Sequence, residues 1–322
     1  MKWHSNRELR HVHCELVFKM NFENNVRATL LYFDFFDHPL TQDELYTFFP
    51  VKMEAGEFSR LLSEALGKAP QGIRASDGFF HIRGNDDVVA VRKRREEEAK
   101  RMLHATRIIG KLLGLFPFVR AAFLSGSLSK GVNDGDADID LFIITAEKRL
   151  WICRFILTGF KKIFLLNKKK FLCPNYFVTE DHLEIPERNI FTATELITLR
   201  PLFNERKLHD ILEANSWVLN FYPNFLLRKR DQHFAFSAVQ RLLELPMGDG
   251  HTANWDARLM NYFKEIWATR YPEFTPSERE FMFRTTPYSS KVHPKDYQSK
   301  ILSAYENRLR KEKLERLIEI DD

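Results

Sequence analysis

Apolar positions recur first at helical and then at strand spacing near the start of the chain. Residues 25–36 carry apolar side chains every three or four positions, which predicts an amphipathic helix. Thr41 and Glu44 have the spacing of a capping box that opens a second, short helix. A third amphipathic helix is predicted at residues 53–66, and two short apolar runs on either side of residues 76–78 indicate a β-hairpin.

Three helices and a hairpin within residues 24–86 resemble a winged helix, so we predict a winged-helix-like domain there. DNA binding would use residues 53–68 as the recognition helix. Acidic residues outnumber basic ones in this segment, whereas contact with phosphate needs the reverse. DNA is therefore disfavoured as a partner, and a structural or docking module is the preferred interpretation.

A long helix followed by alternating strands and helices is expected between residues 87 and 189. The helix begins near Asp87 and ends at Phe116, because Pro117 follows. Strands are expected at residues 118–123, 138–144 and 171–178, with a helix at residues 148–166.

From residue 190 to residue 322 the apolar spacing is almost entirely helical. Thr192 and Glu195 offer another capping box, and the apolar residues after it continue at helical spacing. We therefore expect a C-terminal helical region over residues 190–322, and three regions in all. A length of 322 residues agrees with this count, at roughly 150 residues per domain.

Composition excludes several classes of protein. No apolar run approaches the roughly 20 residues of a membrane-spanning helix, and 29 Phe against 13 Gly describes a packed core rather than a disordered chain. Three widely spaced cysteines and an N-terminus without an apolar stretch predict a cytoplasmic protein. The formal charge of +5 mildly favours anionic partners, small phosphorylated molecules among them.

The first chemical signal is a Gly-Ser turn at Gly126-Ser127. It follows the apolar strand predicted at residues 118–123 and precedes a segment that could begin a helical turn. A junction of this kind exposes backbone N–H groups that suit phosphate oxygens, and the Ser127 hydroxyl could donate one more hydrogen bond. The turn is neither a P-loop nor a dinucleotide-binding fingerprint, and alone it is weak evidence.

The second signal is a pair of aspartates, Asp138 and Asp140, ten residues after the turn. Side chains alternate along a strand, so both carboxylates are expected on one face, about 6.6 Å apart along the chain, with Ile139 and Leu141 in the core. An isolated Asp-x-Asp is usually a pair of turn residues. Beside the Gly-Ser turn, the pair is better explained as a site for Mg²⁺ or Mn²⁺ shared with substrate phosphates.

Together, Gly126-Ser127 and Asp138-Ile139-Asp140-Leu141 resemble the signature of the nucleotidyltransferase superfamily related to DNA polymerase beta. The resemblance is specific over about 25 residues. It implies an α+β fold: a mixed sheet with flanking helices at residues 87–189, preceded by the winged-helix-like domain and followed by the helical region. The whole arrangement also resembles a group of poorly characterised bacterial nucleotidyltransferase-domain proteins.

The family uses a third carboxylate on a neighbouring strand. Glu184, flanked by Leu183 and Ile185, fits an apolar-acid-apolar pattern and is the first choice, while Asp181 in the preceding turn is the second. By this resemblance, Asp138, Asp140 and Glu184 are the catalytic residues and metal ligands. Gly126, Ser127 and Lys130 would bind the nucleotide phosphates.

We therefore expect a metal-dependent nucleotidyltransferase that moves a nucleoside monophosphate from a nucleoside triphosphate, ATP being one candidate, to a hydroxyl acceptor that the sequence does not identify. Two metal ions would bridge the triphosphate and neutralise the charge that develops on pyrophosphate. The alternative is a non-catalytic adaptor that senses nucleotide or binds DNA or protein through its winged helix. The position of the third carboxylate distinguishes these two hypotheses.

Overall fold

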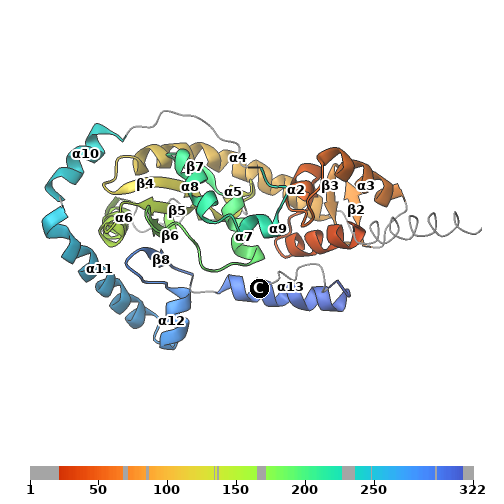
Figure 1. Cartoon of the computed structure of the whole chain (residues 1–322). Coiled ribbons are helices and arrows are strands. Elements are labelled where there is room, and N and C mark those ends of the chain that lie inside the picture. Colours follow the sequence, from red (N-terminus) through yellow and green to blue (C-terminus); the bar gives the residue numbers. More distant parts are fainter. Residues whose placement is uncertain are drawn as a thin grey trace, which may run out of the picture.

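The computed structural model describes residues 22–67, 72–84, 87–133, 135, 138–164, 172–226, 236–247, 249–293 and 296–314. Its described residues form two β-sheets, one with strand order β1-β3-β2 and one with strand order β7-β4-β5-β6-β8, and helices surround both (Figure 1). The predicted α+β class is confirmed.

The N-terminal elements are a helix at residues 22–34, β1 (Leu40–Thr41), α2 (Gln42–Thr47), α3 (Ala55–Gly67), β2 (Arg74–Ser76) and β3 (Phe79–His81). The predicted capping box starts α2, because the Thr41 N–H donates to Glu44 Oε2 at 2.9 Å and the Glu44 N–H donates to Thr41 Oγ1 at 3.3 Å. These are the three helices and the hairpin that a winged helix needs, and the assignment to that fold stays a prediction. The basic residue of α3, Arg60, is paired with Glu64.

The middle of the chain supplies the centre of the larger sheet. A 27-residue helix, α4 (Asp87–Leu113), leads to β4 (Val119–Leu124), the short helix α5 (Gly126–Ser129), β5 (Asp140–Thr145), α6 (Leu150–Phe164) and β6 (Cys173–Thr179). β5 is antiparallel to β4 and parallel to β6. The expected strands and helices are present, with bounds shifted by a few residues.

The region from residue 190 onward is not entirely helical as expected, because it contributes two strands to this sheet. β7 (Arg200–Phe203) pairs antiparallel with β4, and β8 (Ser289–Lys291) pairs antiparallel with β6. β7 and β8 form hydrogen bonds with the backbone groups of β4 and β6 that face away from β5. β7 is short and contains apolar residues at helical spacing, and β8 is polar, so neither has a strand-like sequence pattern.

The helices of this region are α7 (Ile190–Ile197), α8 (Arg206–Ala214), α9 (Val218–Phe221), α10 (Ala238–Glu244), α11 (Asp249–Arg270), α12 (Pro276–Met282) and α13 (Tyr297–Lys311), with a 3-10 turn at Leu245–Met247. Figure 1 shows α10, α11 and α12 at the end of the molecule away from the N-terminal elements. Within the described ranges, no helix is long and apolar enough to cross a membrane.

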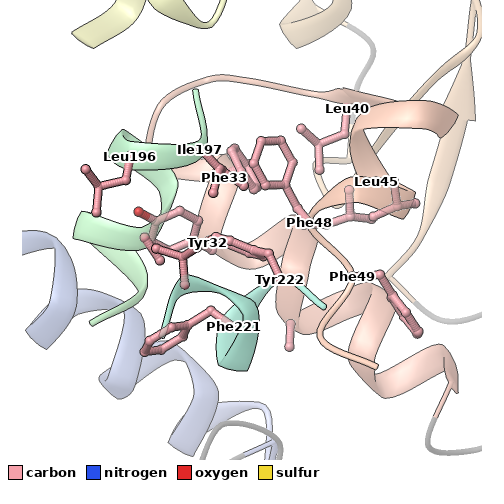
Figure 2. Close-up of a cluster of buried hydrophobic side chains, with 14 of the residues drawn as sticks. Tyr32, Phe33, Leu40, Leu45, Phe48, Phe49, Leu196, Ile197, Phe221 and Tyr222 are labelled. Carbon is pink, nitrogen blue, oxygen red and sulfur yellow. The ribbon is translucent and has the colours of Figure 1, made fainter. Parts of the chain in front are cut away.

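Two buried cores lie on opposite sides of the large sheet. One core includes Trp151 of α6 with Phe263 and Trp267 of α11. The other joins the N-terminal elements to the C-terminal helices, and Figure 2 shows Tyr32 and Phe33 packed among side chains of α7 and α9. The division into three regions stays a prediction, and this second core extends across its boundaries.

Candidate functional site

A pocket of about 710 Å³ lies where the N-terminal elements, the large sheet, α7 and α13 meet. One part of its wall is polar and includes Gly126, Lys130, Asp140, Asn175 and Glu195. Much of the remaining wall consists of aromatic and aliphatic side chains, among them Phe33, Phe36, Phe142, Phe191, Leu196 and Ile301. This combination of an apolar cavity with a few converging polar groups is typical of small-molecule sites.

Gly126 lies at the turn between β4 and α5 and contacts Asp140 directly. Its φ of +68° is a left-handed conformation that favours glycine. A β-carbon at this position would lie 2.4 Å from Asp140 Oδ2, so only glycine lets the aspartate lie against the turn. The Ser125 N–H donates to the Asp140 carbonyl at 3.0 Å, which fixes the turn on the first residue of β5. The structure therefore brings the Gly-Ser turn and the second aspartate together.

The Asp140 carboxyl group is set in an environment that opposes its charge. Burial, then the negative charges of Glu195 and Asp138, raise its pKa to about 7, against the lowering effects of Asn175 and Lys130. Its Oδ1 accepts a hydrogen bond from Asn175 Nδ2 at 2.6 Å. Such a group gains from a nearby cation, because a positive charge offsets the repulsion among the carboxylates.

Asp138 is half-buried and precedes β5, which begins at Asp140. Its charge acts on Asp140, but its side chain is not part of the pocket wall. Ile139, between the aspartates, and Leu141, after them, are both fully buried, as the strand pattern predicts. Part of the segment that precedes Asp138, including Asp134 and Asp136, lies outside the described residues.

Asn175 reaches Asp140 because of an irregularity between β5 and β6. Leu141 pairs with Pro174 and Phe142 pairs with Tyr176, so Asn175 is the extra residue of a bulge. Bulges of this kind redirect a side chain, and here the amide points to the aspartate. The sequence predicted a strand here but did not identify Asn175 as a site residue.

Glu184, the expected third carboxylate, is not part of this site. Instead of a strand, an irregular segment carries it, and its carboxylate accepts a hydrogen bond from Arg188 at 2.5 Å, with 59% of the side chain exposed. Asp181 is likewise away from the pocket wall and pairs with His182 at 2.9 Å. The apolar-acid-apolar pattern suggested a strand, but Leu183 and Ile185 pack against the core from an irregular segment.

Glu195 of α7 is the carboxylate that the fold brings to the Gly-Ser turn. Its Oε2 accepts from the Gly126 N–H at 3.2 Å, and its Oε1 accepts from Lys130 Nζ at 2.6 Å. Burial would raise the pKa of Glu195, but Lys130 and the Gly126 N–H together hold it below its ordinary value. The sequence suggested a capping role for Glu195, whereas Asn189 caps α7 by accepting from the Thr192 N–H at 3.0 Å.

The other two residues expected to bind phosphate, Ser127 and Lys130, both line the pocket. Lys130 Nζ donates to the Gly126 carbonyl at 3.1 Å as well as to Glu195, so the lysine is held over the turn. Its positive charge lies at the polar end of the pocket, next to the Asp140 carboxyl.

A second polar group lies on the wall formed by β8 and the segment after it. Glu187 binds Arg284 at 2.8 Å and Lys291 at 3.1 Å, and Lys291 Nζ also contacts Gln298 at 3.2 Å. His293 is close to both Glu187 and Glu195. Burial and the Lys291 charge lower the His293 pKa to about 4, so this imidazole is neutral at pH 7.

The donors near Asp140 suit one divalent cation shared with a phosphorylated ligand. Mg²⁺ is commonly held by one or two carboxylates together with substrate phosphates and water. Asp138 and Asp140 supply two carboxylates that repel each other, and the Asp138 charge helps to raise the pKa of Asp140. Among the described residues, no group of three or more His, Cys, Asp and Glu side chains is placed to hold a metal. The structure places Glu184 outside the pocket wall, and the expected pair of metals stays a prediction.

No family model, curated protein or solved structure matches this chain.

Proposed function

We propose that the protein is a metal-dependent nucleotidyltransferase that takes a nucleoside triphosphate and a small hydroxyl compound into this pocket. The observation that carries the proposal is the contact between Gly126 and Asp140, which unites the Gly-Ser turn and the second aspartate in the wall of one cavity. The antiparallel β4–β5 pair and the parallel β5–β6 pair support it, because they place the turn, Asp140 and Asn175 at neighbouring positions.

In this proposal the chain binds phosphate through the Gly126 N–H, the Ser127 hydroxyl and the Lys130 ammonium. Asp138 and Asp140 would hold Mg²⁺, which would neutralise negative charge on the phosphates. The acceptor oxygen forms a bond to the α-phosphorus, and the bond from that phosphorus to pyrophosphate breaks. The hydroxyl proton leaves with the pyrophosphate, because the pKa of His293, lowered to about 4, makes this imidazole a poor proton acceptor. The apolar walls hold the organic parts of the two substrates and exclude water.

The second candidate is a protein that binds nucleotide without transferring it. The position of Glu184 favours this candidate, because the third carboxylate expected of a transferase is exposed and paired with Arg188. Asn175, an uncharged amide, lies beside Asp140 instead.

One experiment separates the two candidates. The protein is incubated with each α-³²P-labelled nucleoside triphosphate, Mg²⁺ and a cell extract, and the label is followed into new products, while calorimetry measures nucleotide binding. Transfer that is lost in the Asp138→Ala/Asp140→Ala double variant supports the transferase. Binding that depends on these aspartates without any transfer supports the second candidate. Transfer that survives undiminished in the double variant contradicts the proposed role of the pair.

A further inference from the structure

The Glu195 carboxylate makes the contacts that the proposed function assigns to a phosphate. One oxygen accepts from the Gly126 N–H and the other from the Lys130 ammonium, at 3.2 and 2.6 Å. A backbone N–H beside a lysine is a common pair of donors for phosphate oxygens. Glu195 lines the same pocket and comes from α7, far from the turn in sequence.

The Glu195 carboxylate is also repelled by a second carboxylate, that of Asp140. Asp140 lies against Gly126, and the Glu195 charge raises the Asp140 pKa. Two carboxylates thus approach one glycine, and Lys130 pairs with one of them. Movement of Glu195 away from the turn ends this repulsion and leaves both donors, the Gly126 N–H and the Lys130 ammonium, open to the oxygens of a phosphate.

We propose that Glu195 is an internal competitor for the phosphate position, which a ligand occupies only by displacing this carboxylate from Gly126 and Lys130. Glu195 is then a specificity-determining residue: it sets nucleotide affinity and favours polyphosphates over monophosphates, because a polyphosphate offers more charge and more oxygens to the two donors. The inference rests on the proposed function, since it needs nucleotide phosphates to bind at this turn.

The test is calorimetric titration of the full chain with ATP and with AMP, in EDTA so that no metal contributes. Glu195→Gln removes the charge but keeps an oxygen for the Gly126 N–H, and should raise ATP affinity about tenfold while narrowing the ratio of ATP to AMP affinity. Lys130→Met should reduce ATP affinity about tenfold or more. Glu184→Gln is the control, because it removes one glutamate charge from an exposed position outside the pocket wall, and should change ATP affinity less than threefold.

Two further measurements keep the test decisive if Glu195→Gln folds poorly. Glu195→Asp keeps the charge but shortens the side chain, so it should also raise ATP affinity. In the wild type, the amide resonance of Gly126 should shift on addition of ATP, as its hydrogen-bond acceptor changes from carboxylate to phosphate.

Unchanged or weakened ATP binding in both Glu195 variants, with wild-type binding that still depends on Lys130, overturns this inference and leaves the proposed function in place. If the Glu195 variants bind ATP more weakly than the wild type only when Mg²⁺ is present, Glu195 is a metal ligand, and this result also overturns the inference. If neither the wild type nor the variants bind nucleotide with or without Mg²⁺, the proposed function falls as well.

Discussion

The carboxylate of Asp140 lies so close to Gly126 that a β-carbon on the glycine would approach Oδ2 to 2.4 Å. This contact follows from the pairing of Leu124 with Leu141, which brings the end of β4 to the start of β5. The contact brings together the turn, whose backbone N–H groups are hydrogen-bond donors, and the carboxylate that would face a cation. The polar part of the pocket therefore depends on the absence of a β-carbon at position 126.

Gly126→Ala should therefore disrupt both stability and ligand binding. The left-handed φ of +68° costs an alanine about 1 kcal/mol, and the contact with Asp140 adds to it, so the free energy of unfolding should fall by about 2 kcal/mol or more. ATP affinity should fall at least tenfold, because the turn and Asp140 must move apart. Urea denaturation and calorimetry measure the two effects.

Gly78→Ala is the control for backbone strain alone. Gly78 has a φ of +79° in the β2–β3 turn, and nothing lies within 4 Å of an added β-carbon. It should cost about 1 kcal/mol of stability and leave ATP affinity unchanged. Equal losses of stability in the two variants would show that the Asp140 contact is unimportant.

Asn175→Asp would replace the amide that donates to Asp140 with a third carboxylate. In EDTA at pH 8 the two carboxylates repel in a half-buried setting, and the variant should lose about 2 kcal/mol of stability. Mg²⁺ should restore more stability to Asn175→Asp than to the wild type, because the cation neutralises the added charge. Thermal unfolding with and without Mg²⁺ measures the difference.

Asn175→Ala separates loss of the amide from gain of charge. It should also destabilise the protein, but without any added response to Mg²⁺. A response of Asn175→Asp to Mg²⁺ no larger than that of Asn175→Ala would argue against a cation position beside Asp140.

The pKa of Asp140 predicts how stability changes with pH in the absence of metal. Its folded value of about 7 lies above the ordinary value of 3.8, so between these values the folded state holds a proton that the unfolded state has lost. Stability contributed by the protonated carboxyl is therefore present below about pH 3.8, falls by up to about 1.4 kcal/mol per pH unit as the pH rises, and is lost by about pH 7.

Asp140→Asn removes this titration, so the variant should become more stable than the wild type as the pH rises from 4 to 7, with a constant difference above pH 8. Urea denaturation at a series of pH values in EDTA measures it. A stability difference that is independent of pH would contradict the assigned environment of Asp140.

The parts of the fold that local patterns encode were predictable. The capping box at Thr41, the strands around Gly126 and Asp140 and the buried Ile139 and Leu141 depend on neighbours in sequence, and the structure has them. Gly126, Lys130 and Asp140 could be named for the same reason, since the turn and the strand lie only ten residues apart.

The rest of the site depends on packing between distant segments. Glu195 is 69 residues from Gly126, and only the position of α7 against the sheet brings them together. Asn175 reaches Asp140 through a bulge, a shift of one residue in strand register that no periodic pattern records. The same limit explains why Glu184 was chosen: its local pattern suits a strand, but the structure has no strand at residues 180–189.

Glu184 and Glu187, three residues apart, should differ in how much stability they lose on substitution by glutamine. Glu184 is exposed and paired only with Arg188 in the described part of the chain, so Glu184→Gln should change the free energy of unfolding by less than about 0.5 kcal/mol and leave Mg²⁺-dependent ATP binding unaltered. Glu187 is 10% exposed and neutralises Arg284 and Lys291, so Glu187→Gln leaves a buried excess of positive charge and should cost about 2–3 kcal/mol. Urea denaturation compares the two variants directly. Loss of Mg²⁺-dependent ATP binding in Glu184→Gln, with stability unchanged, would instead return Glu184 to the site as the third carboxylate and require the segment that carries it to move toward Asp140.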